Sequence, residues 1–400
     1  MRNADAAWPG VYCGTPSSMG SCVKDEPAVE NDEDRIPVRT RILPSRKVAI
    51  MNSCFTATRA LIVALGLGSV CSAALAQEPI RMATAWSGGP HLDLFAKGFA
   101  TKVEKLTGGK VKFQVFTGGT IGSPLKITES VQKKVAPAGH TWSGYDLGVD
   151  KTSVLFGGYP GTPGAEVLLH WLYNGGGVEL WEQWRMEKFG IVGMPCGGHS
   201  DEIHMHSKKP VRKIEDLKGL KWRTSGAAAE IGASLGASTV ILAGGDVYPA
   251  LERGLVDAIE WSTPGVNLPF GFQKISKYIV LPGMQTPASV QECQFSKALW
   301  DGFDAQTQML IRQAAKLSTL ESWMEINRMD MDALETFRKQ GVTIMRVDDS
   351  YIEAWKKATR AWEDKYAADP KEVWFKKVLE HKRAFEARWE ASKSYRRDLR

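Results

Sequence analysis

The order of apolar and polar residues after residue 77 predicts alternating strands and helices. The stretch "PIRMATAW" is typical of a strand, and "HLDLFAKGFATKVEKLTGG" places apolar residues on one face of a helix before Gly108 ends it. The stretch "KVKFQVF" alternates apolar and polar positions and predicts a second strand. A strand, a helix and a strand in this order indicate a βαβ unit and therefore an α/β fold.

The same pattern recurs further along the chain and gives way to helix from about residue 296. "LKWRTS" and "STVIL" predict strands, and "GAAAEIGASLG" predicts the helix between them. Trp355, Trp362 and Trp374 make the last helices apolar on one side. We expect a second copy of the chain to cover this surface, from about Ser350 onward, in a homodimer. Packing on the chain's own lobe is the alternative.

Residues 51–76 have the pattern of a secretory signal peptide. Met51 is followed by Arg59 as the positive charge, then by an apolar run, and "ALA" precedes Gln77, so cleavage is expected after Ala76. The apolar run is shorter than the roughly 20 residues of a membrane-spanning helix. Residues 1–50 are polar and without pattern, and we interpret them as sequence upstream of the true start; a real N-terminal extension is the alternative. The mature protein is therefore expected in the periplasm.

Charge and cysteine content narrow the class of protein. The formal net charge of +6 comes from interspersed charges, so nothing suggests nucleic-acid binding. Of six cysteines, only Cys196 and Cys293 follow the predicted signal peptide. They could pair in an oxidising compartment, but we favour two buried free thiols. No nucleophile elbow or phosphate-binding loop stands out.

The stretch "HSDEIHMH" gathers histidines and acids and invites a search for a metal site. Strand spacing would place Glu202, His204 and His206 on one face, and two histidines at this spacing could hold zinc with a third ligand from elsewhere. A half-exposed strand with a polar face is the interpretation that we favour, and a contribution of Glu202 alone to a site is another. Neither HExxH nor CxxC supports zinc.

Three further stretches offer candidates for a binding site. Arg223 ends a predicted strand just before Ser225 opens a helix, where a guanidinium can receive a carboxylate with two parallel hydrogen bonds; a surface arginine is the alternative. Trp142 and Tyr145 could wall a pocket or pack in a core. In "DAIEW", a carboxylate stands beside an indole at a predicted strand end.

Five motifs resemble one family when they are taken in order. "FTGGTIG", "ESVQKKVAPAGHTWSGY", "IEDLKGLKWRTSG", "ALERGLVDAIEW" and "KYIVLPG" follow one another as in DctP-type extracytoplasmic solute receptors of tripartite ATP-independent periplasmic (TRAP) transporters. The resemblance implies a two-lobed periplasmic binding protein fold with a long connecting helix and a C-terminal helical tail. After the upstream segment and signal peptide of residues 1–76, it implies lobe 1 at 77–202, completed by about 285–325, lobe 2 at 203–284, and the tail at 326–400.

The "DAIEW" form of the fourth motif resembles the subgroup that binds 2-oxo and 2-hydroxy monocarboxylates through a metal cation. By this resemblance, Arg223 grips the ligand carboxylate, while Glu260 and the main chain of Trp261 ligate the cation. Where the subgroup has a glutamine as a further ligand, this chain has Glu202, and "STPGVN" stands where the subgroup has "VGPYDD".

These inferences combine into one prediction of function. We expect a receptor that captures a small organic acid and delivers it to a TRAP permease, without catalysing a reaction. The cation ligands are Glu202, Glu260 and Trp261, and two carboxylates favour a divalent ion such as calcium over sodium. The predicted substrate-binding residues are Arg223, Trp261, Tyr145, Trp142 and Trp86. A metal-independent receptor for another carboxylate and an exported zinc hydrolase are the alternatives.

Overall fold

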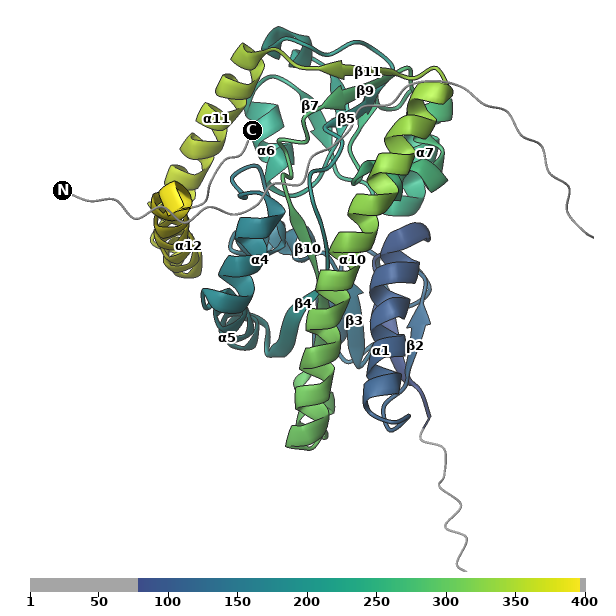
Figure 1. Cartoon of the computed structure of the whole chain (residues 1–400), viewed down its shortest axis with the longest axis vertical. Coiled ribbons are helices and arrows are strands. Elements are labelled where there is room, and N and C mark those ends of the chain that lie inside the picture. Colours follow the sequence, from purple (N-terminus) through teal and green to yellow (C-terminus); the bar gives the residue numbers. More distant parts are fainter. Residues whose placement is uncertain (1–77, 396–400) are drawn as a thin grey trace, which may run out of the picture. The chain divides into compact units, whose positions relative to one another are not determined.

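The computed structural model describes residues 78–395, which form two β-sheets with helices packed on them (Figure 1). The predicted signal peptide and the segment before it lie outside the described residues. The mixed α/β class and the two-lobed architecture predicted from the sequence are confirmed. We call each sheet with its helices a lobe. No helix within residues 78–395 is long and apolar enough to cross a membrane.

The first sheet has the strand order β2-β1-β3-β10-β4. Its strands are β1 (Ile80–Thr84), β2 (Phe113–Phe116), β3 (Ala138–Thr141), β4 (Ile191–His199) and β10 (Ser289–Ser296). β1 runs parallel to β2 and β3, so the predicted βαβ unit is present, with η1 (His91–Lys97) and α1 (Gly98–Leu106) as its helix. β10 comes from much later in the chain and runs antiparallel between β3 and β4. It therefore closes the first lobe from a distant part of the sequence.

The second sheet has the order β11-β9-β5-β8-β6-β7. Its strands are β5 (Met205–Ser207), β6 (Lys221–Arg223), β7 (Ser238–Val240), β8 (Ala258–Ile259), β9 (Tyr278–Leu281) and β11 (Thr343–Arg346). β6 is parallel to β7 and β8, whereas β5 is antiparallel to β8 and β9. The carboxyl ends of the parallel strands β6 and β8 meet at one edge, which is where ligands bind in α/β sheets.

Short helices connect these strands in both lobes. The α-helices are α2 (Ile127–Gln132), α3 (Ser153–Gly157), α4 (Ala165–Asn174), α5 (Gly177–Phe189), α6 (Gly226–Ser234), α7 (Gly244–Glu252), α8 (Pro264–Asn267) and α9 (Lys297–Asp301). The 3-10 turns are η2 (Ser143–Gly148), η3 (Ile214–Leu217), η4 (Leu268–Phe270) and η5 (Phe272–Lys274), and a further one, η6 (Ser392–Tyr395), ends the described residues.

The long helix α10 (Ala305–Lys339) packs on both lobes and is the connecting helix implied by the sequence (Figure 1). Its first half buries Ile311 in the core of the first lobe, and its second half buries Ile326 and Phe337 in clusters of the second lobe. The Asp304 side chain accepts a hydrogen bond from the backbone amide of Thr307 (2.7 Å) and caps the helix.

The tail contains α11 (Asp349–Ala367) and α12 (Val373–Ala391), and also the strand β11, in residues to which the sequence pattern assigned no element. β11 forms because Ile344 and Met345 pair with β9 at the edge of the second sheet. Trp355, Trp362 and Trp374 are 1%, 7% and 6% exposed, so the chain covers them itself. The sequence argument that these tryptophans need a second copy was therefore wrong.

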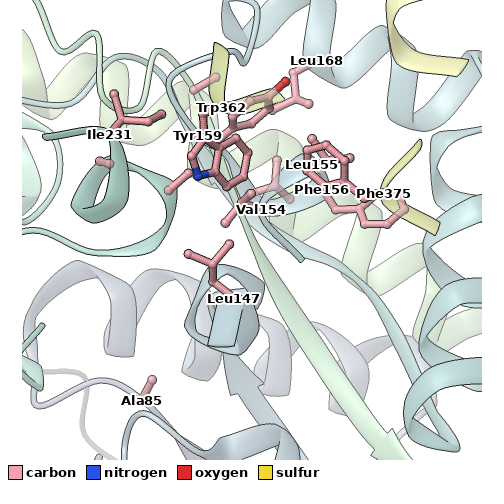
Figure 2. Close-up of a cluster of buried hydrophobic side chains, with 14 of the residues drawn as sticks. Ala85, Leu147, Val154, Leu155, Phe156, Tyr159, Leu168, Ile231, Trp362 and Phe375 are labelled. Carbon is pink, nitrogen blue, oxygen red and sulfur yellow. The ribbon is translucent and has the colours of Figure 1, made fainter. Parts of the chain in front are cut away.

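Packing of the tail on its own lobes is visible around Trp362. Figure 2 shows its indole beside Tyr159 in a cluster that also contains Phe156 and Phe375, and the Trp362 and Tyr159 ring centroids lie 6.2 Å apart. Phe156 and Tyr159 belong to the first lobe, Trp362 to α11 and Phe375 to α12. Trp362 and Phe375 of the tail are thus part of one core with the first lobe.

Cys196 and Cys293 form a disulfide, which corrects the preference for two free thiols. The antiparallel pairing of β4 with β10 places Cys293 opposite Met194 and brings the two cysteine Cα atoms to 5.3 Å. This separation is in the usual range for a disulfide. The sequence alone could not show it, because it depends on the position of β10 within the sheet.

Candidate functional site

A cavity between the two lobes collects side chains from both. Its empty volume is about 370 Å³, which includes space open to solvent. All seven residues predicted to bind substrate or cation line it: Trp86, Trp142, Tyr145, Glu202, Arg223, Glu260 and Trp261. The two lobes thus face each other across these side chains.

Arg223 is held in the cavity wall by main-chain oxygens. It ends β6, and α6 begins at Gly226, as the sequence pattern predicted. Its NH1 donates to the carbonyl of Glu260 (2.6 Å), and its NH2 donates to the carbonyl of Leu242 (2.8 Å). The guanidinium lies 5.3 Å from the Trp261 ring, and the residue is 1% exposed. Its plane is therefore fixed before any ligand arrives.

Glu260 and Trp261 follow directly after β8 and are both buried. The Glu260 carboxylate accepts from the Thr224 hydroxyl (3.2 Å) and lies 3.4 Å from Arg223 NH1. A Cβ atom at Gly244 would lie 2.4 Å from the Trp261 ring, so only glycine leaves room for the indole there. The local order strand end, acid, indole is what brings both groups to the cavity.

Glu202 reaches the same place from the segment before β5. Its carboxyl group accepts from the Gln285 amide (3.3 Å) and lies 3.6 Å from His199 Nε2. Burial, together with the neighbouring Glu260 carboxylate, raises the pKa of Glu202 well above its usual range. Burial lowers the pKa of His199 to about 4, so this histidine is neutral at neutral pH and does not balance the carboxyl groups.

The donors suit a hard cation. Carboxylate oxygens of Glu202 and Glu260 and the main-chain oxygen of Trp261 are the ligand type that calcium prefers. Among the described residues that line the cavity, Arg223 is the one permanent cation. If both acids were ionised, the buried cavity would carry an excess negative charge, which is costly without a counter-ion. The pKa of Glu202 is raised for the same reason, because a second negative charge in this buried cavity is unfavourable.

Comparison with known proteins identifies the family. The model of DctP, bacterial extracellular solute-binding protein family 7, matches residues 82–369. The chain belongs to this family.

Individual relatives agree with this assignment and confirm the predicted resemblance to DctP-type receptors. The chain is 26% identical over 341 residues to a monocarboxylate 2-oxoacid-binding periplasmic protein of Nostoc sp., covering 85% of this chain and 93% of the relative. A TRAP periplasmic solute-binding protein of Pseudoalteromonas atlantica with bound sodium and pyruvate has a TM-score of 0.74 and 27% identity, covering 80% and 96% of the two chains. A protein of the same kind from Colwellia psychrerythraea with bound calcium and pyruvate has a TM-score of 0.73 and 26% identity, covering 80% and 98%.

The histidine-rich segment of this DctP-family protein is not a half-exposed strand. His204 and His206 are fully buried, and β5 begins only at Met205, so strand alternation does not extend back to Glu202. His204 Nδ1 bonds with Gln285 Oε1 and His204 Nε2 with the Tyr351 hydroxyl, each at 2.8 Å. Both ring nitrogens are therefore engaged, which argues against the zinc hydrolase alternative.

One other group has the composition of a metal site. Within residues 78–395, ligand atoms of His140, Cys196 and Cys293 lie within 4.8 Å of one another. Both sulfur atoms belong to the disulfide and are not available as thiolates. His140 instead accepts a hydrogen bond from Trp86 Nε1 (2.8 Å) and so orients a wall residue of the ligand cavity.

Several cavity residues of this DctP-family protein were missed from the sequence: His91, His199, Thr286, Ser289 and Gln291. Gln291 Oε1 is buried without a hydrogen-bond partner. No local signal could have found Gln291, because it lies within β10. His91 had one signal, since it follows the Gly-Pro turn after the first strand, at the sheet edge where α/β proteins bind ligands.

Proposed function

We propose that this protein is a TRAP receptor that binds a 2-oxo or 2-hydroxy monocarboxylate together with a cation, preferentially calcium. The observation that carries the proposal is the meeting of Arg223 with two buried carboxyl groups, Glu202 and Glu260, in one small cavity. The Nostoc relative named as a 2-oxoacid-binding protein and the two structures with pyruvate beside sodium or calcium support it.

Charge balance explains how such a cavity accepts an anion. A divalent cation compensates the two ionised carboxylates, and Arg223 then compensates the ligand carboxylate. Glu202, Glu260 and the main chain of Trp261 are the proposed cation ligands. Arg223, with Tyr145 and the indoles of Trp86, Trp142 and Trp261 around it, is the proposed ligand-binding wall. With sodium, neutrality requires Glu202 to stay protonated, whereas calcium balances both carboxylates and allows both to act as ionised ligands.

The remaining steps are binding, closure and delivery. We propose that lobe 1 (77–202 with about 285–325) and lobe 2 (203–284) close over the ligand by hinge motion, and that 326–400 is the tail. Cleavage of the signal peptide after Ala76 is proposed to release the receptor into the periplasm. There the receptor passes its ligand to a TRAP permease without catalysing a reaction.

We also propose that the receptor is a homodimer. Support comes from apolar side chains that the chain does not cover, among them Met324 (58% exposed), Met331 (67%) and Val373 (67%). Sedimentation velocity at micromolar concentration checks this, and a single monomer boundary would contradict it.

A calorimetric experiment tests the proposed ligand and cation. The purified protein is stripped with a chelator and titrated with pyruvate, lactate, malonate and glucuronate in the presence of calcium, of sodium, or of chelator alone. Pyruvate or lactate binding that requires calcium is the expected result. Equal affinity in chelator would leave a metal-independent carboxylate receptor, and binding of only the larger acids would contradict the proposed ligand class.

A further inference from the structure

A second and larger cavity lies next to the proposed ligand cavity. It encloses about 1440 Å³, including space open to solvent, and apolar side chains make much of its wall, among them Leu125, Leu147, Val149 and Ile241. Leu147, which is labelled in Figure 2, lies on η2, and η2 also carries Tyr145. Charged side chains, including Lys126, Glu129 and Lys188, complete the lining. The cavity is therefore partly apolar and much larger than a small acid needs.

Tyr145 is the one described residue that lines both cavities. Its side chain is half-buried, and Arg223 beside it counteracts the increase in the pKa of Tyr145 that burial produces. The phenol thus stands with one side toward the cationic group of the ligand cavity and another toward the apolar cavity. The Tyr145 ring therefore lies where the two cavities adjoin.

The Tyr145 ring, which lies between the two cavities, packs against Trp142. The two rings meet edge to face with centroids 5.3 Å apart. A Cβ atom would lie 2.3 Å from the Trp142 ring at Gly144 and 2.5 Å from it at Gly226, so the indole fills the space between these two glycines. Trp142 Nε1 also donates to the carbonyl of Gly157 (2.9 Å). Trp142 is therefore fixed, and Tyr145 rests against a rigid neighbour.

We propose that Tyr145 sets the upper size limit of the acid, and that the second cavity is the space in which the chain of a longer 2-oxo monocarboxylate would lie if the ring were absent. The inference rests on the proposed function, because it assumes an acid anchored at Arg223. An acid held there would direct its substituent either against the Tyr145 ring or, without the ring, toward apolar side chains. Each methylene group moved from water into such surroundings tightens binding about fourfold.

The test compares pyruvate, 2-oxobutanoate and 4-methyl-2-oxopentanoate on the full-length mature protein by calorimetry in calcium. The wild type is expected to bind pyruvate most tightly. Tyr145→Ala is expected to weaken pyruvate binding and to tighten 4-methyl-2-oxopentanoate binding about tenfold or more, which reverses the order. Tyr145→Phe keeps the ring and should keep the wild-type order. Ile241→Trp, added to Tyr145→Ala, refills the second cavity and should restore the preference for pyruvate.

The outcomes separate this inference from the proposed function. If the wild type bound none of the acids, both would fail. If the wild type bound pyruvate but Tyr145→Ala still rejected the longer acids, only the size limit would be wrong. A wild type that binds all three acids equally well would also contradict the size limit. Should Tyr145→Ala fail to fold by circular dichroism, Tyr145→Leu, which also removes the ring, must show the same reversal.

Discussion

Arg223 shows at the residue scale how main-chain contacts prepare a side chain for binding. Its guanidinium is oriented by the carbonyls of Leu242 and Glu260, and it is almost fully buried beside Trp261. The guanidinium offers five donors in one fixed plane, whereas the three donors of an ammonium group share a single nitrogen and cannot form two parallel hydrogen bonds from separate nitrogens.

Replacement of this fork should weaken ligand binding although the charge is kept. Arg223→Lys is expected to raise the Kd of the best acid about tenfold or more, because at least one charge-assisted hydrogen bond is lost. Calorimetry measures the effect, and Arg253→Lys, at an exposed position of the same lobe, is the matched control. An unchanged Kd for Arg223→Lys would remove Arg223 from the site.

The two carboxyl groups of Glu202 and Glu260 favour a divalent cation over a monovalent one. Glu202→Gln removes one negative charge and leaves an oxygen donor, so the cavity no longer needs two positive charges from the ion. The ratio of organic-acid affinity in calcium to that in sodium is expected to fall about tenfold, as measured by parallel titrations. Glu215→Gln, at an exposed position, should leave the ratio as it is. A ratio that does not move in Glu202→Gln would show that Glu202 is not a cation ligand.

At the scale of elements, the disulfide fixes β10 beside β4. β10 comes from a distant part of the chain, so the bond holds two remote segments together. The two cysteines are 97 residues apart in sequence, so the bond restricts the unfolded chain strongly. It also lies next to His140, whose ring accepts from Trp86 in the cavity wall.

Loss of this bond should cost stability. The double variant Cys196→Ala, Cys293→Ala is expected to lower the free energy of unfolding by about 2 to 5 kcal/mol. Urea denaturation followed by tryptophan fluorescence measures this, with the wild type under reducing and non-reducing conditions as the comparison. Identical midpoints for the oxidised wild type and the double variant would mean that the bond does not form in the folded protein.

The tail links the two lobes at the scale of the whole molecule, with Glu230 at the junction. Glu230 lies on α6 of the second lobe and accepts from Lys151 of the first lobe (2.6 Å) and from Trp362 and Tyr366 of α11 (2.8 Å each). α11 packs on α6, and α12 packs on α4 of the first lobe. This arrangement holds the lobes together in the described conformation.

A weaker junction should favour separation of the lobes and so reduce ligand affinity from a distance. Lys151→Met is expected to raise the Kd of the acid about two- to fivefold, because a partly exposed ion pair contributes little more than that. Small-angle scattering of the unliganded variant should show a larger radius of gyration than the wild type. Lys105→Met, at an exposed position away from the junction, is the control. Equal Kd values and radii in all three proteins would contradict the role of Glu230 as a link.

The sequence by itself determined the features that depend on neighbouring residues. The βαβ opening, the position of Arg223 between β6 and α6, and the acid–indole pair after β8 follow from local patterns, since strand ends and helix starts are set within a few residues. The resemblance that these patterns carried led to the correct family. What each side chain contacts was predicted less well.

Only the tertiary structure decided the features that depend on pairing between distant segments. β10 enters the first sheet between β3 and β4, and this placement alone puts Gln291 in the cavity wall and Cys293 against Cys196. Burial of His204 under Tyr351, and of the tail tryptophans on their own lobes, likewise needed the tail to be in place. A local pattern specifies an amphipathic face, but the same face can be covered by the chain itself or by a partner, and only the folded chain distinguishes the two.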